Sequence, residues 1–228
     1  MRDFSPWTDI LPAAQLRLWR ELSAIPGEFV LDGGTAIALH LGHRTSVDFD
    51  FFTDRTLKLE SLQHDVPFLR EAKIVQRDMN TLTAIVDRGD PVKVSFFGVP
   101  KLPRLAPPHV ATENNLKVAS LIDLAGTKAS VIQMRAEAKD YFDLDALITL
   151  GNVDLPTALS AAQLLYGPTF NPEVTLKALS FFDDGNLHQV PERVKQRLIH
   201  AVRQVDLDHL PDLAGRSPGI GRDYEQEL

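Results

Sequence analysis

The chain has 228 residues, a formal net charge of −7 and no cysteine, which excludes disulfides and cysteine-ligated zinc. No apolar run approaches the ~20 residues that a membrane helix needs, and the N-terminus lacks the apolar core of a signal peptide, so we expect a cytoplasmic protein. Proteins that bind nucleic acid over their whole surface are usually basic, so any such contact should be local.

Helices and strands alternate in the predicted N-terminal half. Period-two and helical spacing of apolar residues predict helices at 11–25, 36–41 and 57–71, strands at 28–31, 46–52, 73–78, 81–87 and 92–97, and a hairpin turn at 87–91. The first strand ends in a tight turn at Gly33-Gly34. Thr35 is suited to cap the short helix that follows.

The C-terminal half is predicted to be helical. Four prolines within 98–108 indicate a linker. The helices expected after it are 120–135, 141–150, 155–166, 172–181 and 191–203, and the chain from Asp206 should be loop or tail. The expected fold class is α+β, with an α/β domain at 1–110 and a helical domain at 111–228 packed on it.

Asp48 and Asp50 are the first candidate site residues. Two positions apart on a strand, they share one face with Ser46, while Val47, Phe49 and Phe51 should point into the core. Paired carboxylates repel each other and favour a hard cation such as Mg²⁺, which often shares its ligands with substrate phosphates. The glycine turn and helix start just upstream could hold a phosphate. Taken singly, a Gly-Gly is usually a turn and an Asp-x-Asp usually a solvated edge.

The order of these features resembles one known family. The segment LDGGTAIALHLGHRTSVDFDFF, residues 31–52, is similar to the signature of the AbiEii/AbiGii-type toxin nucleotidyltransferases, within the polymerase-β-like superfamily. The resemblance implies a polymerase-β-like nucleotidyltransferase fold, a mixed sheet with flanking helices followed by a helical bundle. We expect Gly33, Gly34 and Thr35 to bind the β- and γ-phosphates with Ser46 assisting, and Arg44, which lies between the phosphate turn and the aspartates, to be a further nucleotide-binding residue.

A second cluster lies at 128–143. Lys128, Arg135 and Lys139 would share one face if their helix is continuous, either as a triphosphate site or as an ordinary solvated face. The segment resembles the downstream Lys…Arg…Lys-Asp motif of the family. That resemblance implies that Lys128 and Arg135 contact the nucleotide and that Asp140 belongs to the active site. Asp143 is interpreted as structural.

The third carboxylate of many polymerase-like transferases is missing from its expected strand, where Ser95 stands. We therefore expect Asp140 to be the remaining catalytic carboxylate, with a helix cap as its alternative role. His43 and His40 are interpreted as polar or packed residues without a catalytic role.

The expected activity is transfer of a nucleoside monophosphate from an NTP to an acceptor hydroxyl, with Mg²⁺ or Mn²⁺ held by Asp48 and Asp50. By resemblance, the biological role is the toxin of a toxin–antitoxin or phage-defence pair that acts on RNA such as tRNA. The cognate antitoxin would act without stable direct contact, and no membrane partner is expected. The alternatives are an antibiotic-type nucleotidyltransferase, which the acidic net charge favours, and a non-catalytic nucleotide-binding module.

Overall fold

The computed structural model describes residues 3–213. Within that range eight strands form one mixed sheet in the order β1-β7-β8-β2-β3-β6-β5-β4. The strands are β1 (Asp3–Phe4), β2 (Val30–Asp32), β3 (Phe49–Thr53), β4 (Lys73–Asp78), β5 (Thr81–Asp87), β6 (Pro91–Gly98), β7 (His109–Ala111) and β8 (Lys117–Val118). The helices are α1 (Ala13–Trp19), α2 (Gly33–Leu41), α3 (Leu59–Asp65), α4 (Leu121–Met134), α5 (Ala138–Thr149), α6 (Leu155–Tyr166), α7 (Pro172–Ala178) and α8 (Glu192–Arg203).

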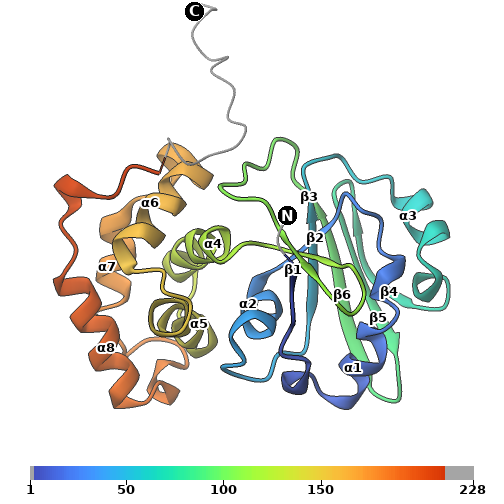
Figure 1. Ribbon diagram of the computed structural model, residues 1–228, viewed down its shortest axis with the longest axis horizontal. Coiled ribbons are helices and arrows are strands. Elements are labelled where there is room, and N and C mark those ends of the chain that lie inside the picture. The colour runs from blue at the N-terminus through green and yellow to red at the C-terminus, as the bar shows by residue number, and fades with distance from the viewer. Residues whose placement is uncertain (1–2, 214–228) are drawn as a thin grey trace, which may run out of the picture.

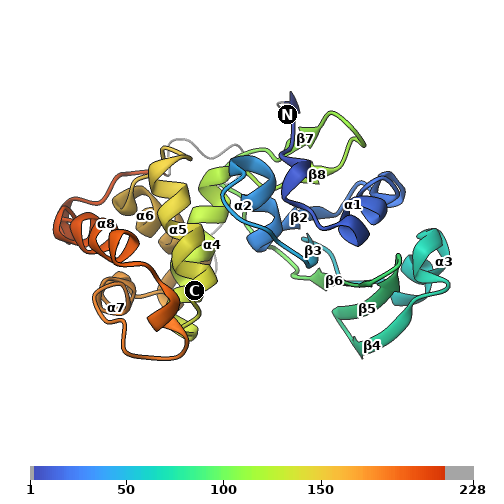
Figure 2. The same cartoon turned by 90° about the horizontal axis from the view of Figure 1, so that it is seen from below.

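The sheet and the helices α4–α8 occupy opposite halves of the molecule (Figure 1). Helix α2 lies between them and packs against both α4 and α5. Helices α1 and α3 lie on the same face of the sheet (Figure 2). This arrangement confirms the expected fold class. None of the helices in the described range combines the length and the hydrophobicity needed to cross a bilayer.

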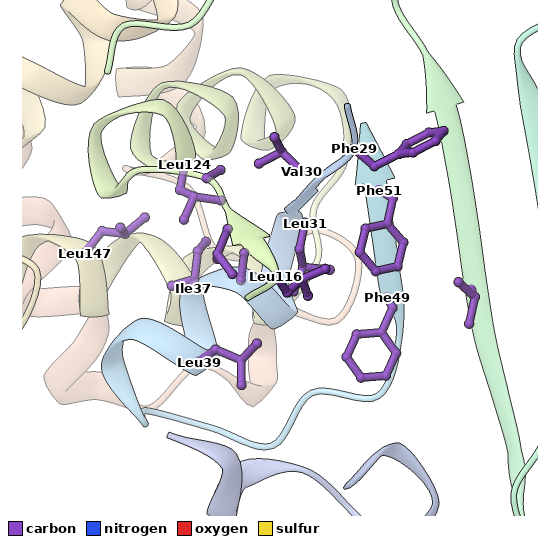
Figure 3. Close-up of a cluster of buried hydrophobic side chains, with 14 of the residues drawn as sticks. Phe29, Val30, Leu31, Ile37, Leu39, Phe49, Phe51, Leu116, Leu124 and Leu147 are labelled. Carbon is purple, nitrogen blue, oxygen red and sulfur yellow. The ribbon is translucent and has the colours of Figure 1, made fainter. Parts of the chain in front are cut away.

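One buried hydrophobic cluster runs through both halves. Figure 3 shows Phe49 and Phe51 of β3, Ile37 of α2, Leu124 of α4 and Leu147 of α5 as parts of it. Because burial of apolar surface is the main stabilising term, this cluster holds α2 and α5 in fixed positions relative to β3. The division at residue 110 stays a prediction, and the sheet itself is completed by β7 and β8, which extend to residue 118.

Several elements have the bounds that the pattern predicts. The strands at 73–78 and 81–87 and the helix at 155–166 are confirmed residue for residue. The hairpin turn is confirmed as well, since Asp87 pairs with Pro91 across the antiparallel β5 and β6. The predicted helix at 11–25 is shorter, ending at Trp19 before a separate 3-10 turn at Leu22–Ala24. Of the predicted tail, 206–213 contains a 3-10 turn at Leu207–His209, and 214–228 lies outside the described residues.

Three expectations near the site are wrong. Helix α2 begins at Gly33 rather than at 36, so its cap is Asp32 and not Thr35. Strand β3 begins at Phe49 rather than at 46, and Val47 is 49% exposed instead of lying in the core. The alternation of the sequence does not distinguish an extended approach to a strand from the strand itself, because both show period two.

The third correction concerns the second cluster. Helix α4 ends at Met134 and α5 begins at Ala138, so no continuous helix carries the three basic residues. The cap of α5 is Glu137, and Asp140 lies inside the first turn. Asn186, about 50 positions further along the chain, stabilises this break. Its side-chain oxygen accepts a hydrogen bond from the Ala138 N–H at 2.6 Å, and its backbone N–H donates to the Ala136 carbonyl.

Candidate active site

The turn between β2 and α2 is built for close approach of the backbone. The buried Asp32 carboxylate accepts a hydrogen bond from the Gly33 N–H at 2.7 Å and so begins the helix. Gly33 has a φ of +75°, which favours glycine, and a Cβ there would lie 3.5 Å from Asp50 Oδ2. A Cβ on Gly34 would overlap the guanidinium of Arg44. Gly33 therefore lets α2 lie directly beside Asp50, and Gly34 leaves room for the Arg44 side chain.

Thr35 and Ser46 fix the segment that carries Asp48. Their hydroxyls are buried and lie 2.7 Å apart, and the Thr35 hydroxyl also donates to the Asp48 carbonyl. Gln15 donates to the Val47 carbonyl at 3.1 Å from the other side. These hydrogen bonds fix the backbone of the segment just before β3. The position of the Asp48 side chain in the site is therefore fixed as well.

The two carboxylates have different surroundings. Asp50 is half-buried in β3, and burial raises its pKa, against a hydrogen bond from Ser95 that lowers it. Ser95 lies directly opposite Asp50 in the parallel pairing of β3 and β6. Asp48 is 37% exposed in its side chain and forms an ion pair with Lys93, Nζ to Oδ2, at 2.8 Å. Ser95 therefore occupies the position beside Asp50 where many polymerase-like transferases have a third carboxylate.

Lys93 was missed in the sequence analysis. It lies on β6 two residues before Ser95 and so faces the same side of the sheet as the carboxylates. Its hydrogen bond to Asp48 raises the pKa of its ammonium. The same period-two argument that placed the carboxylates together would have found it.

Lys128 is the centre of the second cluster. Its Nζ is 2.8 Å from Asp140 Oδ1 and 2.9 Å from Asp143 Oδ2, and the residue is 5% exposed. Arg135 Nε lies 2.8 Å from the second oxygen of Asp140. Burial alone would raise the pKa of Asp140, but the hydrogen bond from Arg135 and the charge of Lys128 outweigh it and hold the pKa below its usual value. Both oxygens of Asp140 are thus engaged by cations.

Asp143 links α5 to the loop after α2. One of its oxygens accepts hydrogen bonds from His43 Nε2 at 2.7 Å and from Arg44 Nε at 2.6 Å, and the other accepts from Arg44 Nη2 at 2.9 Å. Burial would raise the pKa of Asp143, yet the charge of Lys128 and the bonds from His43 and Arg44 lower it far more. The structural interpretation of Asp143 agrees with these contacts. His43, interpreted from the sequence as a polar or packed residue, has a specific partner in Asp143.

These side chains line one pocket between β3, β6 and the α4–α5 junction. Its lining includes the predicted residues Gly34, Thr35, Arg44, Ser46, Asp48, Asp50, Lys128, Arg135 and Asp140, together with Lys93, Lys139 and Asp143. Gly33 lies beside this pocket rather than in its lining. The two clusters therefore meet, although Lys128 and Asp48 are 80 positions apart in the sequence. The pocket combines a carboxylate pair with several cations, as a triphosphate and its metal require.

The comparisons with known proteins show what this chain is similar to. The family model "Nucleotidyl transferase AbiEii toxin, Type IV TA system" matches residues 17–215. An uncharacterized protein from Aquifex aeolicus is 30% identical over 162 residues, which cover 70% of this chain and 76% of the relative. MenT4, a nucleotidyltransferase toxin from Mycobacterium tuberculosis, has a similar structure with a TM-score of 0.60 at 14% identity, covering 86% of this chain and 87% of that one. A structure from H. pylori, described as a nucleotidyltransferase, is similar with a TM-score of 0.55 at 17% identity over 83% and 92% of the two chains.

Proposed function

The chain belongs to the AbiEii family of nucleotidyl transferase toxins of type IV toxin–antitoxin systems, and from that premise we propose that it transfers a nucleoside monophosphate from an NTP to a hydroxyl of RNA, with tRNA as the expected acceptor. Membership of the family implies an NTP substrate. The acceptor and the dependence on a divalent metal are our proposals. In the reaction, the acceptor hydroxyl would lose its proton to solvent and its oxygen would form a bond to the α-phosphorus, as the bond between that phosphorus and the oxygen bridging to the β-phosphate breaks and pyrophosphate leaves.

The convergence of the two clusters in one pocket is the observation that carries this proposal. Four cations that line the pocket come from the helical half and the loop after α2: Lys128 from α4, Arg135 and Lys139 from the α4–α5 junction, and Arg44 from that loop. Cations gathered on one side of a carboxylate pair suit a triphosphate, whose negative charge increases on the leaving pyrophosphate. We assign the triphosphate to this side, with the N–H groups at the start of α2 as further donors.

The donor set of Asp48 and Asp50 fits a Mg²⁺ or Mn²⁺ ion. Within residues 3–213 no group of three or more His, Cys, Asp or Glu side chains is arranged to hold a metal. Magnesium is commonly bound by one or two carboxylates together with substrate phosphates, so two carboxylates beside a triphosphate site are sufficient. A divalent cation bound there would supply neutralisation of the charge on the reacting phosphate.

Asp140 is better suited to positioning than to proton acceptance. Its two oxygens are occupied by Lys128 and Arg135, and its pKa is lowered, so it is a weak base. We therefore propose that Asp140 and Asp143 orient Lys128, Arg135 and Arg44 toward the phosphates. This revises the expectation that Asp140 is the missing catalytic carboxylate.

Incubation of the purified chain with each labelled NTP, Mg²⁺ and total RNA tests the proposal. We expect transfer of label to RNA, loss of transfer on addition of EDTA, and loss of transfer in Asp50→Asn with little change in melting temperature. Asp54→Asn is the matched control, because Asp54 is exposed and follows β3 without lining the pocket. Equal transfer by Asp50→Asn and Asp54→Asn would contradict the assignment of the metal site. Labelling of a small molecule in place of RNA would replace the proposed acceptor.

A further inference from the structure

Phe52 of β3 and Phe97 of β6 form an aromatic pair that the pocket described above does not include. They are paired in the register of the two parallel strands, and their rings stack with centroids 4.8 Å apart and planes 28° from parallel. Both are partly exposed, and among the described residues neither belongs to a buried hydrophobic cluster nor to the side chains packed against one. Adjacent aromatic rings that stay partly exposed outside the core indicate a binding surface.

The pair lies on the face of the sheet that carries the carboxylates. Side chains alternate along a strand, so Phe52 shares a face with Asp50, and Phe97 shares it with Ser95, each about 7 Å further along. The neighbouring Phe51 points to the opposite face, where it stacks on Phe96 in the core. The two rings therefore continue the row of Asp50 and Ser95 along the sheet.

This part of the sheet face is not covered by a helix within the described residues. Figure 2 shows α1 and α3 on the other side of β6, β5 and β4, and α4–α8 beyond β2. On β5, Thr81 lies opposite Phe97 and is also partly exposed. The surface formed by Phe52 and Phe97, with Thr81 at its border, is therefore accessible from solvent and lies beside the carboxylate pair.

The distribution of charge indicates which substrate reaches this surface. Apart from Lys93 on β6, which is paired with Asp48, the cations of the pocket come from α4, the α4–α5 junction and the loop after α2, on the far side of the carboxylate pair from β5. With the triphosphate on that side, the acceptor approaches over β6 and β5. Aromatic rings bind unpaired nucleobases by stacking, which is the usual mode for single-stranded nucleic acid.

We propose that the Phe52–Phe97 pair stacks the terminal nucleobase of a single-stranded nucleic-acid acceptor and so places its hydroxyl beside Asp48 and Asp50. The proposal rests on the nucleotidyl transfer to RNA proposed above and adds the subsite that holds the acceptor end. Selection would be for an unpaired end rather than for one base, because every base offers a face for stacking.

A short single-stranded oligoribonucleotide with 2-aminopurine at its 3′ end tests the subsite directly, since stacking quenches the fluorescence of that base. The full chain should quench it. Phe52→Leu and Phe97→Leu, which remove a ring and keep most of the apolar volume, should bind the oligonucleotide about 10-fold more weakly. Phe52→Tyr and Phe97→Tyr should restore binding. Phe181→Ala is the matched control, because Phe181 is 56% exposed and lies after α7, away from the sheet.

Two further measurements separate the possible failures. The upward shift in melting temperature with NTP and Mg²⁺ should be the same in wild type and in both leucine variants; a reduced shift would mean that the rings bind the NTP base and would overturn the proposal. Unchanged quenching by both leucine variants would also overturn it. Absence of RNA labelling by the wild type would count against the proposed function, whereas quenching by wild type that the leucine variants lose would still support the subsite.

Discussion

Asp143→Asn should destabilise the fold strongly, because the Asp143 carboxylate is the fully buried partner of three donor side chains. Its Oδ1 contacts His43 and Arg44, and its Oδ2 contacts Arg44 and Lys128, at distances of 2.6 to 2.9 Å. An asparagine of the same shape keeps one acceptor oxygen but directs N–H groups toward donors on its other side. Two of the four contacts then become donor against donor.

The magnitude follows from the burial of the partners. Removal of one partner from a buried ion pair costs about 3–5 kcal/mol. Lys128 keeps Asp140 as a second partner, and the Arg44 side chain is 21% exposed and can be partly solvated, so we expect about 3 kcal/mol. For a chain of 228 residues, about 2–4 °C per kcal/mol gives a fall in melting temperature of roughly 6–12 °C.

Thermal unfolding followed by circular dichroism measures this change. Glu137→Gln is the control on the same polypeptide segment, since the Glu137 side chain is 38% exposed and its ion pairs with Lys139 and Arg135 are also exposed. Exposed pairs contribute about 0–1 kcal/mol each, so the loss of both should cost about 1 kcal/mol and lower the melting temperature by about 2–4 °C. If Asp143→Asn melts no lower than Glu137→Gln, the buried carboxylate does not hold α5 to the loop after α2.

Three further predictions concern Asp140, Lys93 and His40. Asp140→Asn should raise the KM for NTP about 10-fold with a smaller effect on kcat, because Lys128 loses its orientation; a loss confined to kcat would favour proton acceptance by Asp140. Lys93→Met should tighten Mn²⁺ binding measured calorimetrically without nucleotide, since it removes the ammonium 2.8 Å from Asp48, and weaker binding would contradict the metal assignment. Burial lowers the pKa of His40 from 6.5 to about 4, so the unfolded chain takes up the proton first and the free energy of unfolding should fall, by at most about 3 kcal/mol, as pH drops from 6.5 to 4. In urea titrations at several pH values, the free energy of unfolding should depend less steeply on pH in His40→Gln than in wild type. An equal slope in the two proteins would refute this account.

The tertiary contacts account for what the sequence pattern missed. Asn186 holds the break between α4 and α5, and a contact over about 50 positions leaves no trace in local periodicity. The short strands β7 and β8 have too few residues for a detectable alternation. The cap of α2 is Asp32 because its carboxylate accepts a hydrogen bond from the Gly33 N–H, whereas the Thr35 hydroxyl is engaged by Ser46 and the Asp48 carbonyl.

Local sequence patterns were sufficient to predict several elements and the residue types of the site. Alternation specified β4 and β5, the helical period specified α6, and the glycines and aspartates of 33–50 identified the family. How the two clusters meet depends on the packing of separate elements: Lys128 is buried between Asp140 and Asp143, and Arg44 crosses Gly34 to reach Asp143. The physical reason is that local patterns report which face of an element is apolar, whereas the partner of a buried charge depends on how separate elements pack.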